Sequence, residues 1–259
     1  LKELFLDTIN YKKNLAGVPV SIRISKSKYE KIKNIIDKTV SSTFGLWFDL
    51  KNRNKKTILL LELFPSLYKE LLYDLKSDEY NVITINQRRP VTLDKKSINI
   101  LKNSDCKMIS KESILQKDDI EEIMKNQKEY SKKIDKLWIE KEQLFRNIFE
   151  IENLDFWSFI KEDFKQVYSK RINQYVESIL FSKKIFETIN VVSILSLNDI
   201  GETERAFLKC KNDNVNTFIL EHGFQLMLEE NKRFGTLSSY DSFEGSYFVW
   251  SDFQKQFII

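Results

Sequence analysis

Histidine, glycine, proline and cysteine are all scarce in this chain. Its 259 residues include one His, 6 Gly, 3 Pro and 2 Cys. So few turn-forming residues argue against a disordered chain, a collagen-like chain and a turn-rich all-β fold. The two cysteines, Cys106 and Cys210, stand far apart and form no CxxC pair. A disulfide framework and a structural zinc site are therefore not indicated, and a reducing cytosol fits best.

Long apolar runs and strong net charge are missing as well. No run approaches the roughly 20 apolar residues that a membrane-spanning helix needs, and the start, LKELFLDTINYKK, is charged and unlike a signal peptide. Lys and Arg number 42 against 38 Asp and Glu, a net charge of +4, which does not predict a nucleic-acid partner. The chain begins with Leu1 and ends at FQKQFII within an expected helix. We therefore expect an excerpt from a longer cytoplasmic protein.

Several well-defined sequence signatures are absent too. There is no GxGxxG after a strand, no GxxxxGK[ST] and no GxSxG, and no cluster with metal-ligand spacing. A nicotinamide-dependent enzyme, a P-loop NTPase and a serine hydrolase with a nucleophile elbow are therefore not indicated. We expect no cofactor and no metal.

What the chain does have is a repeated strand-and-helix pattern. TILLLEL (57–63), NVITIN (81–86) and CKMIS (106–110) have strand length and are separated by amphipathic stretches of helical periodicity. VVSILSL (191–197), VNTFILEHG (215–223) and SYFVWSD (246–252) continue the pattern. In the first of the intervening helices, Pro65 is expected in the first turn. Strands that alternate with helices predict an α/β fold with a parallel, doubly wound sheet.

We expect two sections. Residues 1–55 form an N-terminal strand-helix section, with a strand at 18–24, and residues 56–259 form the sheet domain. Within the latter, residues 111–155 are dense in charge and have apolar residues every three or four positions, which predicts a charged helical insertion. This segment could be a solvated helix that packs one face on the domain, or a coiled-coil contact with a partner. A second long helical stretch, richer in aromatic residues, follows it.

The lone histidine, His222, marks the first candidate site. It follows the apolar strand TFIL and Glu221, and it precedes Gly223. Ligands of open parallel sheets bind at the carboxyl ends of the strands, and glycine lets backbone approach a ligand closely. A neutral imidazole there could take a proton from a hydroxyl group. The alternative is a structural histidine that packs at the end of its strand.

Polar residues also follow the other predicted strands. Glu62 and Ser66 come after the first strand, and Arg88 and Arg89 after the second. The fourth strand ends in Asn198 and Asp199, which read most simply as a turn and helix cap. Arginine at a strand end can pair with phosphate or carboxylate, although such residues are often solvated loop residues. We include Ser66, Arg88, Arg89 and Asn198, with Glu221 and Gly223, among candidate substrate-binding residues.

The C-terminal part of the chain resembles a known family. A helix, VVSILSL, a helix, VNTFILEHG, a long loop and YFVWSDFQKQFI resemble the amino-terminal half of GT-B glycosyltransferases that build surface polymers, such as capsule polysaccharide transferases and CDP-glycerol glycerophosphotransferases. The residues that carry the resemblance are His222-Gly223 and Val249-Trp250-Ser251, although Ser251 stands where Gly is common. The resemblance covers residues 190–259 well and residues 57–110 only in their strand-helix pattern.

This resemblance implies a Rossmann-like, acceptor-side domain that works with a second, donor-binding half. It implies that His222 is the base for an acceptor hydroxyl, and that a carbohydrate or polyol acceptor and a nucleotide-activated donor are the ligands. It also implies action in the cytoplasm, with peripheral association at the inner face of the membrane as a further option. Two alternatives stay open: an enzyme similar to nucleotide-sugar 2-epimerases, and a non-catalytic scaffold that binds a partner through the helical insertion.

Overall fold

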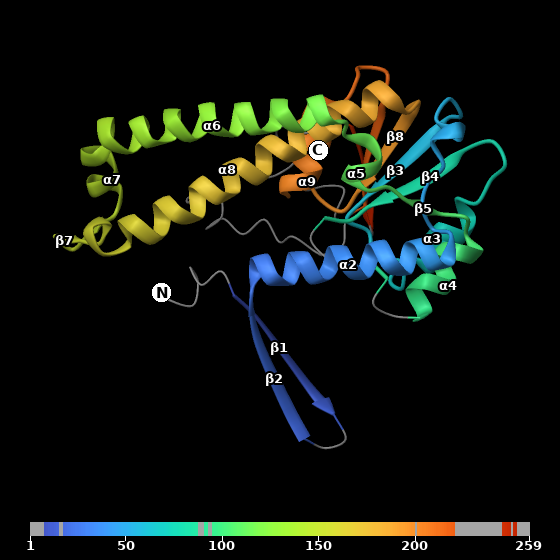
Figure 1. Cartoon of the computed structure of the whole chain (residues 1–259), viewed down its shortest axis with the longest axis horizontal. Helices are drawn as coiled ribbons and strands as arrows, with labels where there is room; N and C mark the ends of the chain where they lie inside the picture. The colour runs from blue at the N-terminus through green and yellow to red at the C-terminus, as the bar shows by residue number, and fades with distance from the viewer. Residues whose placement is uncertain are drawn as a thin grey trace. The chain divides into compact units, whose positions relative to one another are not determined.

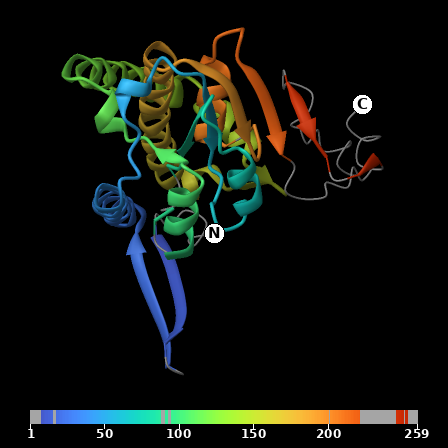
Figure 2. The same cartoon turned by 90° about the vertical axis from the view of Figure 1, so that its right-hand side faces the viewer.

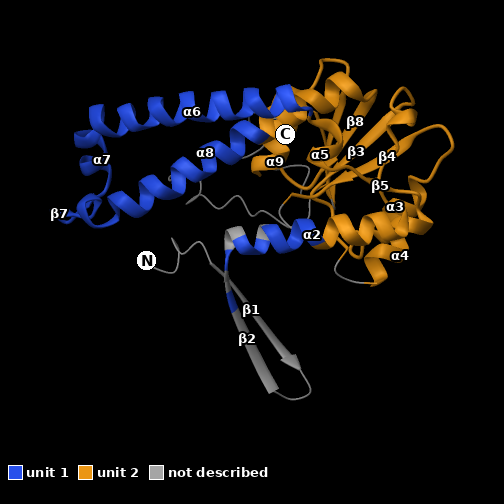
Figure 3. Cartoon of the chain, viewed as in Figure 1, with its two compact units in different colours: residues 1–35, 116–177 blue, residues 36–115, 178–259 orange. Residues whose placement is uncertain are grey.

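The computed structural model describes residues 8–15, 18–87, 91–92, 95–199, 201–220, 245–249 and 251–252. The chain divides into two compact units, coloured in Figure 3. One unit comprises residues 1–35 and 116–177, and the other comprises residues 36–115 and 178–259. The predicted sections, 1–55 and 56–259, stay a prediction. The second unit contains the main sheet and is described first.

The main sheet has six parallel strands (Figures 1 and 2). In chain order they are β3 (Thr57–Leu61), β4 (Asn81–Ile85), β5 (Lys107–Met108), β8 (Val191–Ser196), β9 (Asn216–Leu220) and β10 (Ser246–Phe248). In the sheet they lie in the order β10-β9-β8-β3-β4-β5, and each neighbouring pair is parallel. The chain fills one half of the sheet outward from β3 and then the other half outward from β8. This order is doubly wound and Rossmann-like, which confirms the predicted class of fold.

Helices cover both faces of this sheet, as Figure 2 shows. The helices that lie wholly in this unit are α3 (Lys69–Asp74), α4 (Lys95–Asn103), α5 (Lys111–Ile114) and α9 (Glu202–Cys210), and the unit also includes the C-terminal parts of α2 (Lys26–Phe44) and α8 (Trp157–Thr188). One core joins the sheet to α8 and α9; its buried members include Leu59, Ile83, Phe181, Ile185, Ile194 and Phe207. The other core joins the sheet to α3 and α4; its buried members include Leu60, Leu72, Val82, Leu101 and Leu195. The unit is therefore a three-layer structure.

The apolar run in β3 fits its place as one of the two central strands. Leu59, Leu60 and Leu61 are each 0% exposed. Side chains alternate between the two faces of a strand, so Leu59 and Leu61 enter one core while Leu60 enters the other. A strand that is covered on both faces needs a continuous apolar sequence, and TILLL provides one.

The predicted strands are confirmed where the structure describes them, but their ends differ. The first strand stops at Leu61, before the predicted end at residue 63, because Glu62 has φ 55° and leaves the extended conformation. The prediction that Pro65 lies in a first helical turn is wrong: residues 65–67 form a turn, and α3 begins only at Lys69. The end of the fifth predicted strand, 221–223, and the helix expected at FQKQFII lie outside the described residues.

The first unit begins with an antiparallel hairpin of β1 (Thr8–Leu15) and β2 (Val18–Ser25). β2 and the helix α2 that follows it agree with the predicted strand at 18–24 and the helix after it. The strand β1 was not predicted from the sequence. Its sequence, TINYKKNL, has two adjacent lysines, Lys12 and Lys13, which interrupt the alternation that identifies a strand.

The first unit also holds a helical hairpin in which α6 (Lys117–Glu140) lies beside α8 (Figure 1). Between them come α7 (Glu142–Ile148) and a short hairpin of β6 (Glu150–Ile151) and β7 (Leu154–Asp155). Six aromatic rings contact one another here, with Trp138 and Trp157 buried: Trp138, Phe145, Phe149, Trp157, Phe164 and Tyr168. Lys–Glu pairs four residues apart, such as Glu129 with Lys133 at 2.7 Å, lie on the solvated side of α6. That residues 111–155 are an insertion into the sheet domain stays a prediction.

Candidate functional site

The carboxyl ends of β3 and β8 define the candidate site. These strands are neighbours, with Leu61 opposite Ser196 at their last paired position, and the strand order reverses between them. The chain after β3 leads to α3 on one face of the sheet, and the chain after β8 leads to α9 on the other face. Ligands of doubly wound sheets bind where two successive connections diverge in this way.

Glu62 is the first residue after β3 at this position. Its φ of 55° places it in the left-handed region, which costs a residue with a side chain on the order of 1 kcal/mol or more. Its carboxylate Oε1 accepts a hydrogen bond of 2.7 Å from the backbone N–H of Gln87, just after β4. Glu62 therefore links the carboxyl ends of two neighbouring strands.

Gln87 carries the link further, to helix α8. The hydroxyl of Ser178 donates to Gln87 Oε1 at 3.2 Å, which fixes the orientation of the side-chain amide. The other end of that amide, Nε2, is buried and makes no hydrogen bond within the described part of the chain. A buried N–H without a partner is costly, so Gln87 is a donor that a bound ligand could satisfy.

The loop after β8 is held in place by its own side chains. The hydroxyl of Ser196 donates to the backbone oxygen of Asn198 at 2.7 Å. Asn198 Oδ1 accepts from the Gly201 N–H at 2.7 Å, and Asn198 Nδ2 donates to Glu204 Oε1 at 3.1 Å. Glu204 is 0% exposed, and a Cβ on Gly201 would overlap its carboxylate, so any side chain at position 201 would have to displace that buried group. The side chain of Asn198 therefore positions this loop.

Asp199, in the same loop, has a carboxylate that is buried and poorly hydrogen-bonded, unlike the side chain of Asn198. The residue is 9% exposed, and its buried Oδ1 accepts no hydrogen bond from the residues that the structure describes. Burial raises the pKa of the Asp199 carboxyl above its ordinary value, while Arg205 acts in the opposite direction. A buried, poorly paired carboxylate with a raised pKa can exchange a proton with a ligand hydroxyl or accept its hydrogen bond.

The structure places only two of the residues that the sequence analysis put in the site. Ser66 lies in the turn at 65–67 after β3, three residues before α3, and Asn198 lies in the loop after β8. Both are therefore at the carboxyl edge of the sheet. The other predicted site residues lie outside the described residues: Arg88, Arg89, Glu221, His222 and Gly223.

Gln87 is not among the site residues predicted from the sequence. Its partner, Ser178, is 91 residues away in sequence, and no local pattern indicates that contact. The sequence feature that could have identified Gln87 is its position just after a predicted buried strand, next to Arg88. Asp199 was noted as a turn residue, but its burial could not be read from the sequence.

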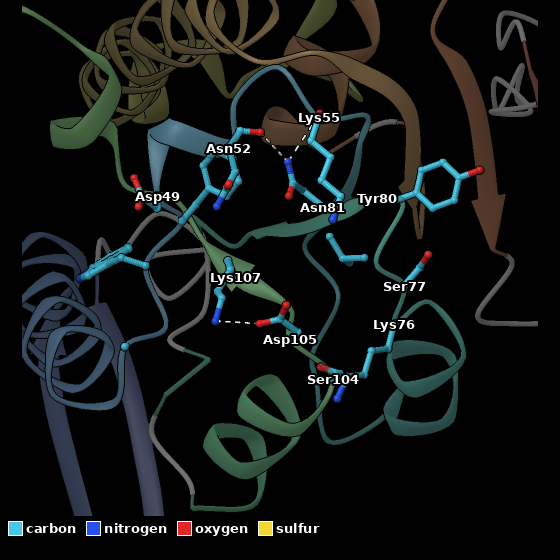
Figure 4. A pocket seen from close by; sticks show the side chains of 14 residues that line it. Asp49, Asn52, Lys55, Lys76, Ser77, Tyr80, Asn81, Ser104, Asp105 and Lys107 are labelled. Atoms are coloured by element: carbon cyan, nitrogen blue, oxygen red, sulfur yellow. Dashed lines mark hydrogen bonds and ion pairs between the residues drawn. The ribbon is translucent and has the colours of Figure 1, made fainter.

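A separate hollow of ≈ 280 Å³ lies at the opposite, amino-terminal edge of the sheet (Figure 4). Asn81 and Lys107, which line it, are the first residues of β4 and β5. Lys107 pairs with Asp105 at 2.9 Å, and Lys76 donates to a backbone oxygen at 3.0 Å. Since these charged groups bind the protein itself, and ligands of parallel sheets bind at the carboxyl edge, we do not assign the site to this hollow.

The described residues contain no group of three or more His, Cys, Asp or Glu side chains that could hold a metal ion. Cys106 is completely buried, and burial raises its pKa to about 12, so its thiol is not reactive at neutral pH. Cys210, at the end of α9, is partly exposed. Neither cysteine lies at the carboxyl edge near Glu62, Gln87 or Asp199.

The chain matches no protein-family model, no curated protein sequence and no solved structure at a significant level. Its class is therefore set by its own fold: an α/β protein with a Rossmann-like parallel sheet.

Proposed function

We propose that this chain is the acceptor-side part of a glycosyltransferase-like enzyme of surface polysaccharide biosynthesis. In this proposal a sugar or polyol phosphate passes from a nucleotide-activated donor to a hydroxyl group of a carbohydrate or polyol acceptor. The observation that carries the proposal is the reversal of strand order between β3 and β8, with Glu62, Gln87 and Asp199 at the carboxyl edge. The resemblance of residues 190–259 to GT-B enzymes is its second support.

The described side chains at this edge suit the hydroxyl groups of an acceptor. Glu62, Gln87 and Asp199 provide carboxylate and amide groups there. Carboxylate oxygens accept hydrogen bonds from hydroxyl groups and repel phosphate. In the proposal, Arg88 and Arg89, which follow Gln87 in sequence, meet any acidic group of the ligands.

The proposed reaction needs a base, and His222 has that role by resemblance. It follows the last residue of β9, Leu220, by two positions in the sequence. The acceptor oxygen forms a bond to the donor's anomeric carbon or phosphorus, the bond to the nucleotide breaks, and the hydroxyl proton passes to His222. Asp199 would hold the acceptor hydroxyls, and the donor would be bound mainly by a second half of the enzyme.

The proposed location is the cytoplasm, with peripheral association at the inner face of the membrane as an option. None of the helices within the described ranges is long and apolar enough to span a bilayer. Any membrane contact in this proposal is therefore peripheral for this part of the chain.

The test measures nucleotide release by the full-length protein from a panel of nucleotide-activated sugars and polyols, with and without polyol acceptors. We expect acceptor-dependent release that falls at least about a hundredfold in His222→Ala, while Asp213→Asn, an exposed control, keeps full activity. Unchanged nucleotide release in His222→Ala would show that His222 is not the base. Conversion of the nucleotide sugar without an acceptor would instead favour the 2-epimerase alternative.

A further inference from the structure

Exposed apolar side chains are concentrated at one end of the helical hairpin. This end, called here the tip, is residues 139–159, which comprise the end of α6, α7, β6, β7 and the start of α8 (Figure 1). Among the described residues, 16 large apolar side chains are exposed, and six of them lie in the tip: Ile139, Leu144, Ile148, Ile151, Leu154 and Phe159. Apolar residues that gather on the surface of one short segment, and are not scattered singly, indicate an interaction site.

The β6–β7 hairpin shows how the tip directs apolar side chains outward. Its two cross-strand pairs are Glu150–Asp155 and Ile151–Leu154, and successive pairs lie on opposite faces of the hairpin. Asp155 forms an ion pair with Arg146 of α7, so one face of the hairpin is held against α7. Ile151 and Leu154 lie together on the other face, where both are more than half exposed.

The tip is supported by a buried tryptophan, so its outer residues are held in place. Trp157 is 0% exposed, and its ring stacks with those of Phe145 and Phe149 at centroid distances of 4.9 and 5.5 Å. The indole Nε1 of Trp157 donates a hydrogen bond of 3.1 Å to Glu142 Oε1. These contacts join α7, the residue before β6 and the start of α8. A surface that is already ordered loses less conformational entropy when it binds.

The tip is also an acidic part of a basic chain. Its 21 residues contain five acidic and two basic side chains, a net charge of −3, so the rest of the chain carries 4 − (−3) = +7. Glu150 and Glu152, which flank Ile151, are exposed and form no ion pair with residues that the structure describes. Of the two basic residues, Arg146 is engaged by Asp155. The exposed apolar side chains are therefore bordered by negative charge that a partner can meet.

Charge decides which partner fits this surface. An anionic lipid surface or a nucleic acid would be repelled by a net charge of −3. Contact between the tips of two copies would bring the same negative charges together, which is unfavourable. A protein surface whose apolar residues are flanked by lysine and arginine matches both properties. Its apolar part would cover the exposed side chains, and its charge is complementary.

We propose that the tip docks a partner protein through a surface of apolar residues flanked by lysine and arginine. The side chains of Ile151, Leu154 and Phe159 become buried in this contact, and burial of apolar surface supplies its affinity. Glu150 and Glu152 face the basic residues of the partner at the rim, where charge sets the rate of encounter and the choice of partner. This inference does not depend on the proposed transferase activity.

The first test is calorimetric titration of the full chain with a synthetic amphipathic helix of about 15 leucine and lysine residues. A peptide with glutamate in place of every lysine is the matched probe. We expect the leucine–lysine peptide to bind, more weakly at about 1 M salt, where the Debye length is about 3 Å, and the leucine–glutamate peptide not to bind. Binding of neither peptide, or equal binding of both, overturns the proposal.

A pair of substitutions tests the apolar side chains. Ile151→Ser with Leu154→Ser leaves all charges in place and should weaken binding of the leucine–lysine peptide at least about tenfold, because apolar burial is lost. Both positions are largely exposed, so the fold should persist, which circular dichroism checks. Ile120→Ser with Met124→Ser is the matched control, exposed on α6 outside the tip, and should leave binding within about twofold. An equal loss in the control contradicts a specific surface.

A second pair of substitutions tests the acidic border. Glu150→Gln with Glu152→Gln should weaken binding of the leucine–lysine peptide about two- to fivefold, as expected for exposed charge pairs. Glu121→Gln with Glu122→Gln removes the same charge from exposed positions on α6 and should have a smaller effect. Equal losses in the two variants would mean that only the total charge matters, and would overturn the proposal.

The remaining experiments examine the two competing occupants, a lipid surface and a second copy of the chain. Flotation uses vesicles of phosphatidylcholine alone or with about 30% phosphatidylglycerol, and sedimentation velocity uses the protein alone. Neither vesicle binding nor self-association should differ between the original protein and Ile151→Ser with Leu154→Ser. Vesicle binding that is lost in this variant would assign the tip to lipid, and a dimer that becomes monomeric would assign it to a second copy. Either result overturns the proposal.

Discussion

Replacing Asp199 by Asn should make the protein more stable while it weakens function. Asp199 is 9% exposed and its Oδ1 accepts no hydrogen bond from the described residues. A buried polar group without a partner costs about 1–3 kcal/mol, and more when it is charged. Asparagine keeps the shape and removes the charge. We expect the free energy of unfolding at neutral pH to rise by about 1 kcal/mol, or roughly 2–4 °C in Tm.

The pH dependence of this effect has a definite sign. Burial raises the pKa of Asp199 in the folded protein above the ordinary value of 3.8. The folded protein therefore keeps the proton to a higher pH than the unfolded chain does, and the contribution of Asp199 to stability is fully present only below pH 3.8. It is lost as the pH rises through the folded pKa. The advantage of Asp199→Asn should thus be absent at the acid end and complete above the raised pKa.

Urea or thermal unfolding, followed by circular dichroism at several pH values, measures this difference. Asp213→Asn is the matched control, because Asp213 is exposed in the turn before β9 and should change stability by no more than about 0.5 kcal/mol. A variant Asp199→Asn that is less stable than the original protein at neutral pH would show that the carboxylate makes a stabilising interaction. The reasoning from its unpaired oxygen would then be refuted.

Two further substitutions test the packing around the site and in the helical hairpin. Gly201→Ala should lower the free energy of unfolding by about 1–3 kcal/mol, because the new Cβ would overlap the buried carboxylate of Glu204; a Tm equal to that of the original protein would contradict the close approach. Trp157→Ala should lower the free energy of unfolding by about 3–5 kcal/mol and reduce hydrogen-exchange protection in residues 117–177, because Trp157 is 0% exposed among stacked rings. Phe159→Ala is the control: Phe159 is 83% exposed, so this change should have little effect in the same measurement.

The sheet was readable from the sequence because burial on both faces requires apolar runs. TILLL and NVITI correspond to β3 and β4, and the alternation of strands and helices predicted the parallel, doubly wound class. The end of β3 could not be predicted, because no residue in LELFP indicates that Glu62 has a positive φ. β1 was missed because adjacent lysines hide its alternation, and its cross-strand partner is what defines it as a strand.

Only the location of the candidate site, and not its contacts, could be predicted from the sequence. Polar residues after buried strands predicted the carboxyl edge, and Ser66 and Asn198 do lie there. The contacts that give the edge its chemistry join distant segments, such as Ser178 with Gln87, and depend on how α8 crosses the sheet. The burial of Asp199 likewise arises from packing around its loop, which no local pattern encodes.

The environments of the two cysteines make the chain suited to labelling at one chosen position. Cys106 has no exposed surface and a pKa of about 12, so it forms almost no thiolate at neutral pH, whereas Cys210 is partly exposed. A maleimide dye should therefore react with Cys210 in preference to Cys106. Cys210 ends helix α9, whose nine residues begin at Glu202, beside the loop that holds Asp199. The dye would sit about 13 Å along one helix from that loop, and its emission would report ligand binding at the carboxyl edge from a position outside it.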